Sequence, residues 1–315
     1  MIHTQELTRK FRKLTAVSSV NLHVPRGTIF GFIGPNGAGK TTTLRMLATL
    51  LRPTAGTITI DGHDAASDPE AIRRKLGYLS DSFGLYEDLK VWEYLDYFCG
   101  AYGVQKADAK VDEVLEVVQL AHKKDELVGR LSRGMRQRVG IARMLVYEPK
   151  LILLDEPANG LDPLARISLR ELLKKLRTQG VTILVSSHIL TELSDFCDTV
   201  GIMELGRLIA AGSIEEILAQ TRTHLRLILE VLGPAEKAKE VLQGEARVKD
   251  LEIIVAGAAA ESGTARLEMG FLGEKEDLPA LHKRLVEANV PVVAFYPKTE
   301  NLEDLFMRLS TGATN

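Results

Sequence analysis

Short runs of apolar residues alternate with segments of helical periodicity through about the first 220 residues of the chain. This alternation is typical of strand–helix–strand units that build a mainly parallel sheet. Between Val91 and about Tyr147 the pattern is almost wholly helical, which predicts a helical insert in an α/β core. The predicted strands are 28–33, 57–61, 151–154, 181–186 and 200–205, and the predicted helices are 41–51, 91–102, 111–120 and 135–147.

The pattern changes after about Arg222, where apolar and polar residues alternate from Leu225 to Val231. Such alternation predicts a strand with one solvated face. The elements that follow have the order of split strand–helix–strand repeats, which predicts a ferredoxin-like α+β sandwich. We therefore expect a first domain at 1–221, with a helical subdomain at about 85–147, and a second domain at 222–315. The second domain has predicted strands at 225–231, 247–255, 265–271 and 290–296, helices at 234–243, 275–288 and from Leu302, and a hairpin loop at 257–263.

The composition fits a folded protein of about two domains. The chain has 315 residues, 45% of them hydrophobic and 26% charged, and a domain commonly has about 150 residues. Forty Lys and Arg against 42 Asp and Glu give a net charge of −2, so no overall positive field favours nucleic acid or an anionic bilayer. The two cysteines, Cys99 and Cys197, have neither disulfide-framework nor metal-site spacing, which indicates a reducing compartment.

Neither a secretory signal nor a membrane span is apparent in the sequence. The first 14 residues mix basic and polar groups without an apolar core. The longest apolar runs have four or five residues, far from the ~20 that cross a bilayer. We therefore expect any membrane role to depend on a partner.

The segment Gly34-Pro35-Asn36-Gly37-Ala38-Gly39-Lys40-Thr41 fits the pattern G-x-x-x-x-G-K-[ST] between a predicted strand and a predicted helix. Its glycines let backbone N–H groups converge on phosphate oxygens, and the helix N-terminus favours an anion. We expect Lys40 to lie near the β- and γ-phosphates and Thr41 to ligate Mg²⁺. The alternative is a glycine-rich turn with a solvated lysine. The residues predicted to hold the nucleotide here are Gly34, Asn36, Gly37, Ala38, Gly39, Lys40, Thr41 and Thr42.

Two adjacent carboxylates, Asp155 and Glu156, follow the apolar run 151–154. Ligands bind at the carboxyl ends of parallel strands, so we expect Asp155 to hold Mg²⁺ and Glu156 to polarise the water that attacks the γ-phosphate. Without the glycine turn, the two acids would be interpreted as a helix N-cap and a surface charge. The Asn-Lys-x-Asp quartet of GTPases is absent from the sequence, which favours ATP.

The segment Leu131-Ser132-Arg133-Gly134-Met135 opens a predicted helix 23 residues before Asp155. It resembles the signature motif of ATP-binding cassette (ABC) proteins, and the resemblance spans about residues 2–220. The resemblance implies that two cassettes pack head to tail, with Ser132 and the backbone of Gly134 contacting the γ-phosphate in the other copy. Because every expected catalytic part occurs on this chain, a homodimer suffices.

Three further positions match the same family in order. The resemblance implies that Phe11 stacks on adenine and that residues 159–162, which end at Asp162, cross the dimer interface. It also implies that His188 contacts the γ-phosphate, which completes a predicted catalytic set of Lys40, Glu156 and His188. The alternatives are a core aromatic for Phe11 and a structural histidine for His188.

Two motifs depart from the family pattern, at three positions in total. Arg133 and Met135 replace a glycine and the glutamine of Leu-Ser-Gly-Gly-Gln, whereas Ser132 and Gly134 are kept. We hypothesise that Arg133 places a cation near the opposing nucleotide, and the alternative is an arginine that faces solvent. Asp81 stands where the family has a glutamine that contacts Mg²⁺, so we expect Asp81 to reach the metal.

Residues 83–97 combine several aromatic side chains with the only tryptophan of the chain, Trp92. In the family this segment lines the groove for a coupling helix of the membrane permease, and the alternative is a set of core aromatics. The whole chain resembles the ATPase subunit of a type-2 ABC exporter. That resemblance implies ATP and Mg²⁺ as ligands, a separate integral-membrane permease as partner, no nucleic acid, and a cytoplasmic position on the inner face of the cell membrane. The competing interpretations are a soluble cassette ATPase that acts on a ribosome or DNA complex, and a C-terminal domain that regulates or senses substrate.

Overall fold

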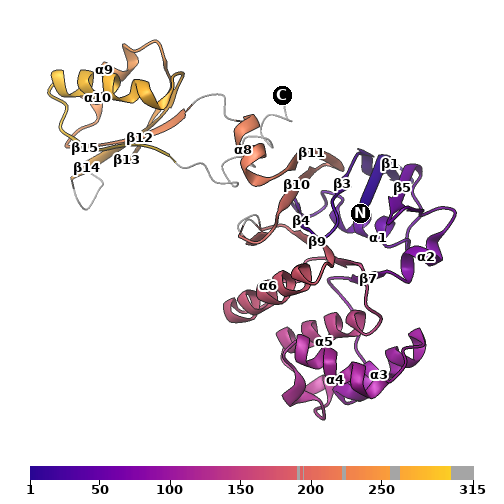
Figure 1. The fold of residues 1–315 in the computed structure, drawn as a ribbon. Helices are drawn as coiled ribbons and strands as arrows, with labels where there is room; N and C mark the ends of the chain where they lie inside the picture. Colours follow the sequence, from indigo (N-terminus) through magenta and orange to yellow (C-terminus); the bar gives the residue numbers. More distant parts are fainter. Residues whose placement is uncertain (190–191, 194, 222–224, 256–262, 299–315) are drawn as a thin grey trace. The chain divides into compact units, whose positions relative to one another are not determined.

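In the computed structural model the chain divides into two compact units, of which the first is Met1–Ile214 and the second begins at Glu215. The structure describes residues 1–189, 192–193, 195–221, 225–255 and 263–298 (Figure 1). Each unit is built around its own cluster of buried hydrophobic side chains. The domain boundary expected from the sequence, between residues 221 and 222, stays a prediction.

A six-stranded sheet forms the centre of the first unit, in the order β11-β10-β4-β9-β8-β7. The strands from β10 to β7 are parallel to their neighbours, and β11 pairs antiparallel with β10 at the edge. Parallel strands buried on both faces are continuous apolar runs, which is why the sequence pattern predicts β4, β8, β9 and β10, whereas β7, which contains Gly77 and Tyr78, was not predicted. The strands are β4 (Ile29–Ile33), β7 (Leu76–Leu79), β8 (Leu151–Leu154), β9 (Thr182–Ser187), β10 (Thr199–Glu204) and β11 (Arg207–Gly212).

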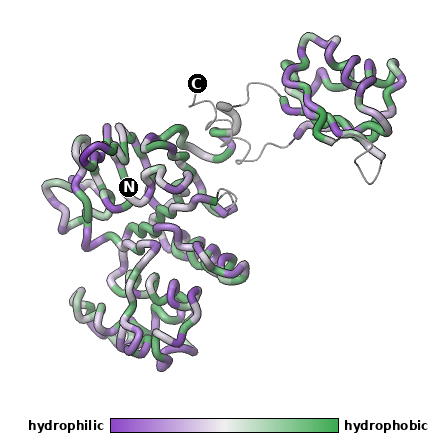
Figure 2. The backbone as a smooth tube through the Cα atoms, turned by 180° about the vertical axis from the view of Figure 1, so that it is seen from behind, coloured by the Kyte–Doolittle hydropathy of each residue, from purple (hydrophilic) through white to green (hydrophobic). Residues whose placement is uncertain are grey.

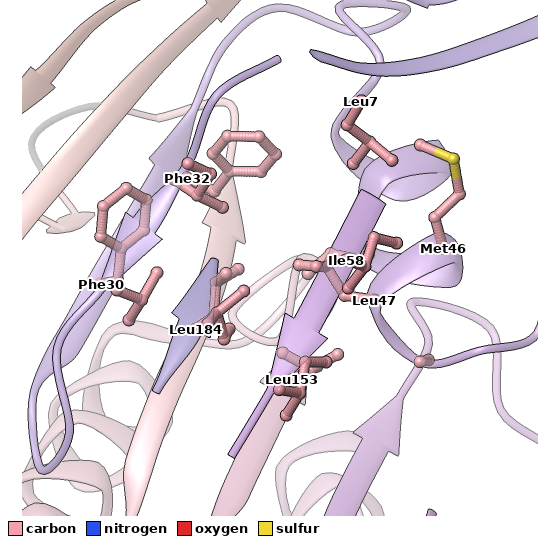
Figure 3. Close-up of a cluster of buried hydrophobic side chains, with 14 of the residues drawn as sticks. Leu7, Phe30, Phe32, Met46, Leu47, Ile58, Leu153 and Leu184 are labelled. Atoms are coloured by element: carbon pink, nitrogen blue, oxygen red, sulfur yellow. The ribbon is translucent and has the colours of Figure 1, made fainter. Parts of the chain in front are cut away.

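A second, antiparallel sheet belongs to the same unit, in the order β2-β1-β5-β6 with β3 paired to β1. One hydrophobic cluster joins both sheets to α1 (Figure 3), with Leu7 and Ile58 from the antiparallel sheet, Met46 and Leu47 from α1, and Phe30, Phe32, Leu153 and Leu184 from the parallel sheet. The common core fixes the two sheets relative to α1. The strands are β1 (Ile2–Phe11), β2 (Leu14–Val20), β3 (His23–Val24), β5 (Ala55–Ile60) and β6 (His63–Asp64).

Three helices, α3 (Val91–Tyr102), α4 (Ala107–Val117) and α5 (Arg133–Leu145), pack on one another as a separate group (Figure 1). Hydrophobic and hydrophilic residues are interleaved along them (Figure 2), as expected of helices with one buried face. The other helices of the first unit are α1 (Lys40–Leu47), α2 (Pro69–Arg73) and α6 (Pro163–Thr178), and short 3₁₀ turns cover Ala121–Lys123 and Val128–Arg130; α8 (Ile214–Thr221) spans the start of the second unit.

Several helices differ from the sequence prediction, and α2 and α8 were not predicted. The helix predicted to run to residue 51 ends at Leu47, since Thr49 has a left-handed backbone with φ 58°. Helix α6 was not predicted, although Asp162 caps its start and Pro163 occupies its first turn. No helix within the described residues is long and apolar enough to cross a bilayer.

The second unit has the strand–helix–strand–strand–helix–strand order expected of a ferredoxin-like sandwich. Its sheet is antiparallel throughout, in the order β13-β14-β12-β15. The predicted helix from Leu302 and nearly all of the predicted 257–263 loop lie outside the described residues. The elements are β12 (Leu225–Leu232), α9 (Glu236–Gln243), β13 (Val248–Val255), β14 (Thr264–Phe271), a 3₁₀ turn at Lys275–Asp277, α10 (Leu278–Glu287) and β15 (Val292–Pro297).

Candidate functional site

A cavity of about 580 Å³ lies at the amino end of α1, within the ~300–1,000 Å³ typical of ligand sites. Its wall combines the turn between β1 and β2, the glycine turn, and the segments that follow β7, β8, β9 and β10. Most of the predicted nucleotide residues therefore meet in one place. The lining residues are Phe11, Leu14, Thr15, Ala16, Asn36, Gly37, Ala38, Gly39, Lys40, Thr41, Thr42, Asp81, Glu156, Asn159, His188, Leu205 and Gly206.

The turn before α1 needs glycine for two different reasons. Gly37 and Gly39 have φ of 85° and 103°, which side chains other than glycine rarely adopt. A Cβ on Gly39 would also lie 2.5 Å from the carbonyl oxygen of Ala16, and one on Gly34 would collide with the carbonyl oxygen of Met203. Helix α1 starts without a side-chain cap, so its first N–H groups can bind an anion.

Lys40 lies inside this turn and is only 5% exposed. Its Nζ donates to the carbonyl oxygen of Gly34 at 2.6 Å and to that of Pro35 at 3.2 Å. The same Nζ lies 3.2 Å from Oε1 of Glu156. A buried ammonium needs such compensation, and these contacts hold the cation where the turn surrounds it.

Asp155 is 2% exposed at the end of β8. Its Oδ1 accepts hydrogen bonds from Thr41 Oγ1 at 3.1 Å and from Ser186 Oγ at 2.8 Å. Burial raises the pKa of Asp155, and the bonds from Ser186 and Thr41 act in the opposite direction. The carboxylate and hydroxyl oxygens form a hard donor set that fits Mg²⁺ when phosphate oxygens and water complete the coordination. Ser186 was not predicted as a site residue from the sequence. The one feature that could have indicated it is a polar residue near the end of a buried strand.

Glu156 is held from both sides. His188 Nδ1 lies 2.8 Å from Oε2 of Glu156, and the His188 backbone N–H donates to the same oxygen at 3.3 Å. The Glu156 backbone is left-handed, with φ 49°, a conformation that costs about 1–3 kcal/mol. Its N–H donates to Ser186 Oγ at 3.0 Å, so the surrounding contacts maintain the strained backbone and aim the carboxylate at Lys40.

Phe11 is 41% exposed and lies in the cavity wall. The guanidinium of Arg9 lies 4.5 Å from the centroid of its ring. This exposure excludes the alternative of a core aromatic. A ring that lines the cavity is available to stack on a nucleobase, and that role stays a prediction.

Ser132, Gly134 and Asp162 do not line the cavity of their own chain. Ser132 is the N-cap of α5 and accepts from the Met135 N–H at 3.3 Å. Asp162 is the N-cap of α6 and accepts from the Ala165 N–H at 2.9 Å. A Cβ on Gly134 would lie 3.1 Å from Cβ of Ala165, so the starts of α5 and α6 are in close contact.

The two departures contact consecutive residues of the loop between β8 and α6. Asp81 Oδ1 accepts from Asn159 Nδ2 at 3.3 Å. The guanidinium of Arg133 lies against Gly160, and a Cβ built on Gly160 would be 2.7 Å from Cζ of Arg133. Asp81 and Arg133 also line a neighbouring cavity of about 220 Å³, together with Glu156. Asp81 therefore hydrogen-bonds the loop that follows Glu156, and Arg133 packs against it.

Three tyrosines of the 83–97 segment, Tyr86, Tyr94 and Tyr97, form one series of ring contacts with Phe98. Tyr86 contacts Tyr94 and Tyr97, with ring centroids 6.1 and 5.9 Å apart, and Phe98 contacts Tyr94 and Tyr97 at 5.0 and 5.2 Å. Tyr94 is buried, whereas Tyr86 and Tyr97 are each 56% exposed. Tyr94 therefore belongs to the core, and the interpretation of the segment as a groove for a permease helix stays a prediction.

The parallel sheet, the glycine turn before α1 and the acidic pair after β8 together define a P-loop nucleoside triphosphatase. The sequence profile of the ABC transporter family matches residues 17–159. The bacitracin transport ATP-binding protein BcrA of Bacillus licheniformis is 36% identical over 315 residues, which cover all of this chain and 98% of that protein. The daunorubicin resistance ATP-binding protein DrrA3 of Streptomyces coeruleorubidus is 31% identical, over 96% of this chain and 93% of that protein.

Solved structures agree with these relatives. An ATP-binding subunit of an ABC transporter superimposes with a TM-score of 0.64 at 33% identity, over 70% of this chain and 92% of that one. An ATP-binding cassette described as dimeric, post-hydrolysis and bound to ADP and Pi gives a TM-score of 0.61 at 28% identity, over 68% of this chain and 99% of that one. The chain belongs to the ABC transporter family. The prediction of an ATP-hydrolysing subunit of an ABC exporter is confirmed, and the interpretation as a soluble cassette acting on a ribosome or DNA is not favoured.

Proposed function

We propose that ATP is hydrolysed in the cavity at the amino end of α1 with Glu156 as the residue that activates water. The observation that carries this proposal is the Glu156 carboxylate, which is held between Lys40 Nζ at 3.2 Å and His188 Nδ1 at 2.8 Å. Its position beside the glycine turn is where a general base must lie to reach a water next to a bound γ-phosphate.

The remaining cavity residues divide between the parts of the nucleotide. Phe11 stacks on adenine, and the backbone N–H groups of 36–42 hold the phosphates with the side chain of Lys40. Thr41 and Asp155 hold Mg²⁺, and Asp81, which lines the cavity, adds a contact to the metal. Mg²⁺, when bound, neutralises negative charge on the phosphate oxygens.

The chain's own residues account for the water and proton movements. Glu156 orients the attacking water and accepts its proton, while Lys40 stabilises charge that develops on the γ-phosphate. His188 keeps the Glu156 carboxylate in place and contacts the same phosphate. The strained backbone of Glu156 supports this assignment, because strain of this kind concentrates at catalytic positions.

We propose that the active form is a head-to-tail homodimer, in which Ser132 and Gly134 of one copy complete the cavity of the other. Both residues lie at an exposed helix start away from their own cavity, and a solved relative is described as dimeric. Asp162, at the start of α6, would lie at the same interface. Each copy carries the cavity of one site and the Ser132–Gly134 helix start of the other, so a second copy is needed to complete either site.

The dimer is proposed to work beneath a separately encoded membrane permease, on the inner face of the cell membrane. Exposed Tyr86 and Tyr97 give an apolar surface with acidic neighbours that suits a short helix of such a partner. Relatives named for bacitracin transport and daunorubicin resistance favour export. The permease would select the cargo.

The decisive experiment is the substitution Glu156→Gln, with Glu171→Gln as a matched control on the exposed side of α6. We expect Glu156→Gln to bind ATP, to lose turnover, and to accumulate a dimer in ATP during size-exclusion chromatography, whereas Glu171→Gln behaves as wild type. Normal turnover in Glu156→Gln would remove Glu156 from its role.

Full activity that does not depend on protein concentration would refute the dimer. Copurification with a multi-span protein from detergent-solubilised membranes tests the permease.

A further inference from the structure

Arg166, in the first turns of α6, connects two segments that flank the catalytic cavity. Its Nε donates to the carbonyl oxygen of Leu161 at 3.0 Å, in the loop that follows Glu156. Its Nη1 lies 2.8 Å from Oε1 of Glu192, in the segment after β9. One guanidinium therefore contacts both segments, and its rigid fork suits such a bridge.

Glu192 continues the connection to both neighbours of His188. Ser187 Oγ donates to Oε2 of Glu192 at 3.1 Å, and the N–H of Ile189 donates to Ser187 Oγ at 2.9 Å. Ser187 is 3% exposed, and the Glu192 side chain is 17% exposed. The hydrogen bond from Ser187 to Glu192 is charge-assisted and partly buried, whereas the Arg166 side chain is 38% exposed.

The contacts close into a ring. It runs from Glu156 along the loop to Leu161, through Arg166 and Glu192 to Ser187, and from His188 back to Glu156 through the 2.8 Å contact of Nδ1 with Oε2. We infer that Arg166 and Glu192 are positioning residues that fix His188 against Glu156 for hydrolysis. The inference rests on the proposed roles of Glu156 and His188 and adds two residues that do not line the cavity.

The expected effect follows from how sharply catalysis depends on geometry. Loss of either partner removes the α6 contact that connects through Ser187 to His188, so that His188 no longer holds one position relative to Glu156. A misplacement of about 1 Å at a reacting group costs roughly 100-fold in rate. Nucleotide binding should remain, because neither Arg166 nor Glu192 lines the cavity.

The chain contains a matched control pair. Arg170 Nη1 lies 2.9 Å from Asp195 Oδ2, which joins α6 to the same segment after β9, one helical turn further along α6 and without a contact to the loop that follows Glu156. A purely structural role, in which any ion pair docks α6 against the segment after β9, predicts equal effects for both pairs. A specific positioning role predicts an effect on hydrolysis for the Arg166–Glu192 pair alone.

The test measures kcat, KM and equilibrium ATP binding for Arg166→Gln, Glu192→Gln and their double variant beside Arg170→Gln and Asp195→Asn. We expect kcat to fall roughly 10- to 100-fold for the first pair with KM and binding unchanged, and the double variant to be no worse than either single one. The control pair should keep kcat near wild type. In a His188→Ala background, Arg166→Gln should cause no further loss.

Each outcome separates the positioning role from the proposed function. The positioning role is overturned if kcat stays at the wild-type value in Arg166→Gln or Glu192→Gln. It is also overturned if the control pair loses as much kcat. In either case, loss of turnover in Glu156→Gln still supports the proposed function. A further loss from Arg166→Gln in the His188→Ala background also overturns the positioning role. Full turnover in both Glu156→Gln and His188→Ala overturns the two proposals together.

Discussion

Replacing Gly39 by alanine should lower the free energy of unfolding of the first unit by about 2–5 kcal/mol. Forcing an L side chain into left-handed backbone costs roughly 1–2 kcal/mol, and the φ of Gly39 is 103°. The new Cβ would lie 2.5 Å from the Ala16 carbonyl oxygen and 2.8 Å from Cε of Met203. Overpacking of this kind costs a further 1–3 kcal/mol, roughly, because the backbone oxygen cannot rotate away.

Gly37→Ala provides the comparison that isolates the packing contribution. Gly37 also has a positive φ, of 85°, but no atom among the described residues lies within 4 Å of a Cβ built there. Its substitution should cost only the backbone strain, about 1–2 kcal/mol. Urea unfolding followed by tryptophan fluorescence reports on the first unit alone, since the only tryptophan of the chain is Trp92 on α3. Equal losses for the two variants would refute the contribution assigned to the Ala16 and Met203 contacts.

Three other substitutions test the energetics of single side chains. Burial raises the pKa of Asp155, so the charged carboxylate destabilises the folded state at neutral pH. Asp155→Asn should therefore unfold at a higher urea concentration than wild type at neutral pH. This difference in urea midpoint should disappear as the pH falls to about 4, because wild-type Asp155 becomes protonated. Asp61 has its pKa lowered, chiefly by the hydrogen bond from Lys75. Its stabilisation is present above about pH 4 and is lost as the pH falls through the folded pKa, so Asp61→Asn should cost about 1–3 kcal/mol at neutral pH and nothing in strong acid. Ser132→Ala should cost about 1 kcal/mol through its cap and lower turnover, while ATP binding by the monomer stays unchanged; normal turnover would contradict its role across the dimer.

Local pattern was enough to predict the parts of the site that lie on one segment. The strand before the glycine turn and the acidic pair after β8 are contiguous in sequence, so an apolar run and a motif identify them. Ser186 was missed because its bond to Asp155 depends on the register of β8 against β9. The end of α1 was misplaced because Leu50 continues the apolar pattern, although the left-handed Thr49 interrupts the helix. Contacts of the signature residues with a second copy depend on assembly, which the pattern of one chain does not encode.

The cavity wall draws on both sheets of the first unit, with Phe11 and Ala16 from the antiparallel sheet, and with Lys40 at the start of α1 and His188 directly after β9 of the parallel sheet. A nucleotide that touches both walls must lose those contacts before the sheets can separate. By mass action, bound nucleotide then raises the free energy of unfolding, by about 2.7 kcal/mol when the free nucleotide concentration is a hundredfold above its Kd. Energy supply and resistance to unfolding are thereby coupled in one molecule, so that depletion of nucleotide both stops the cycle and loosens the protein that performs it.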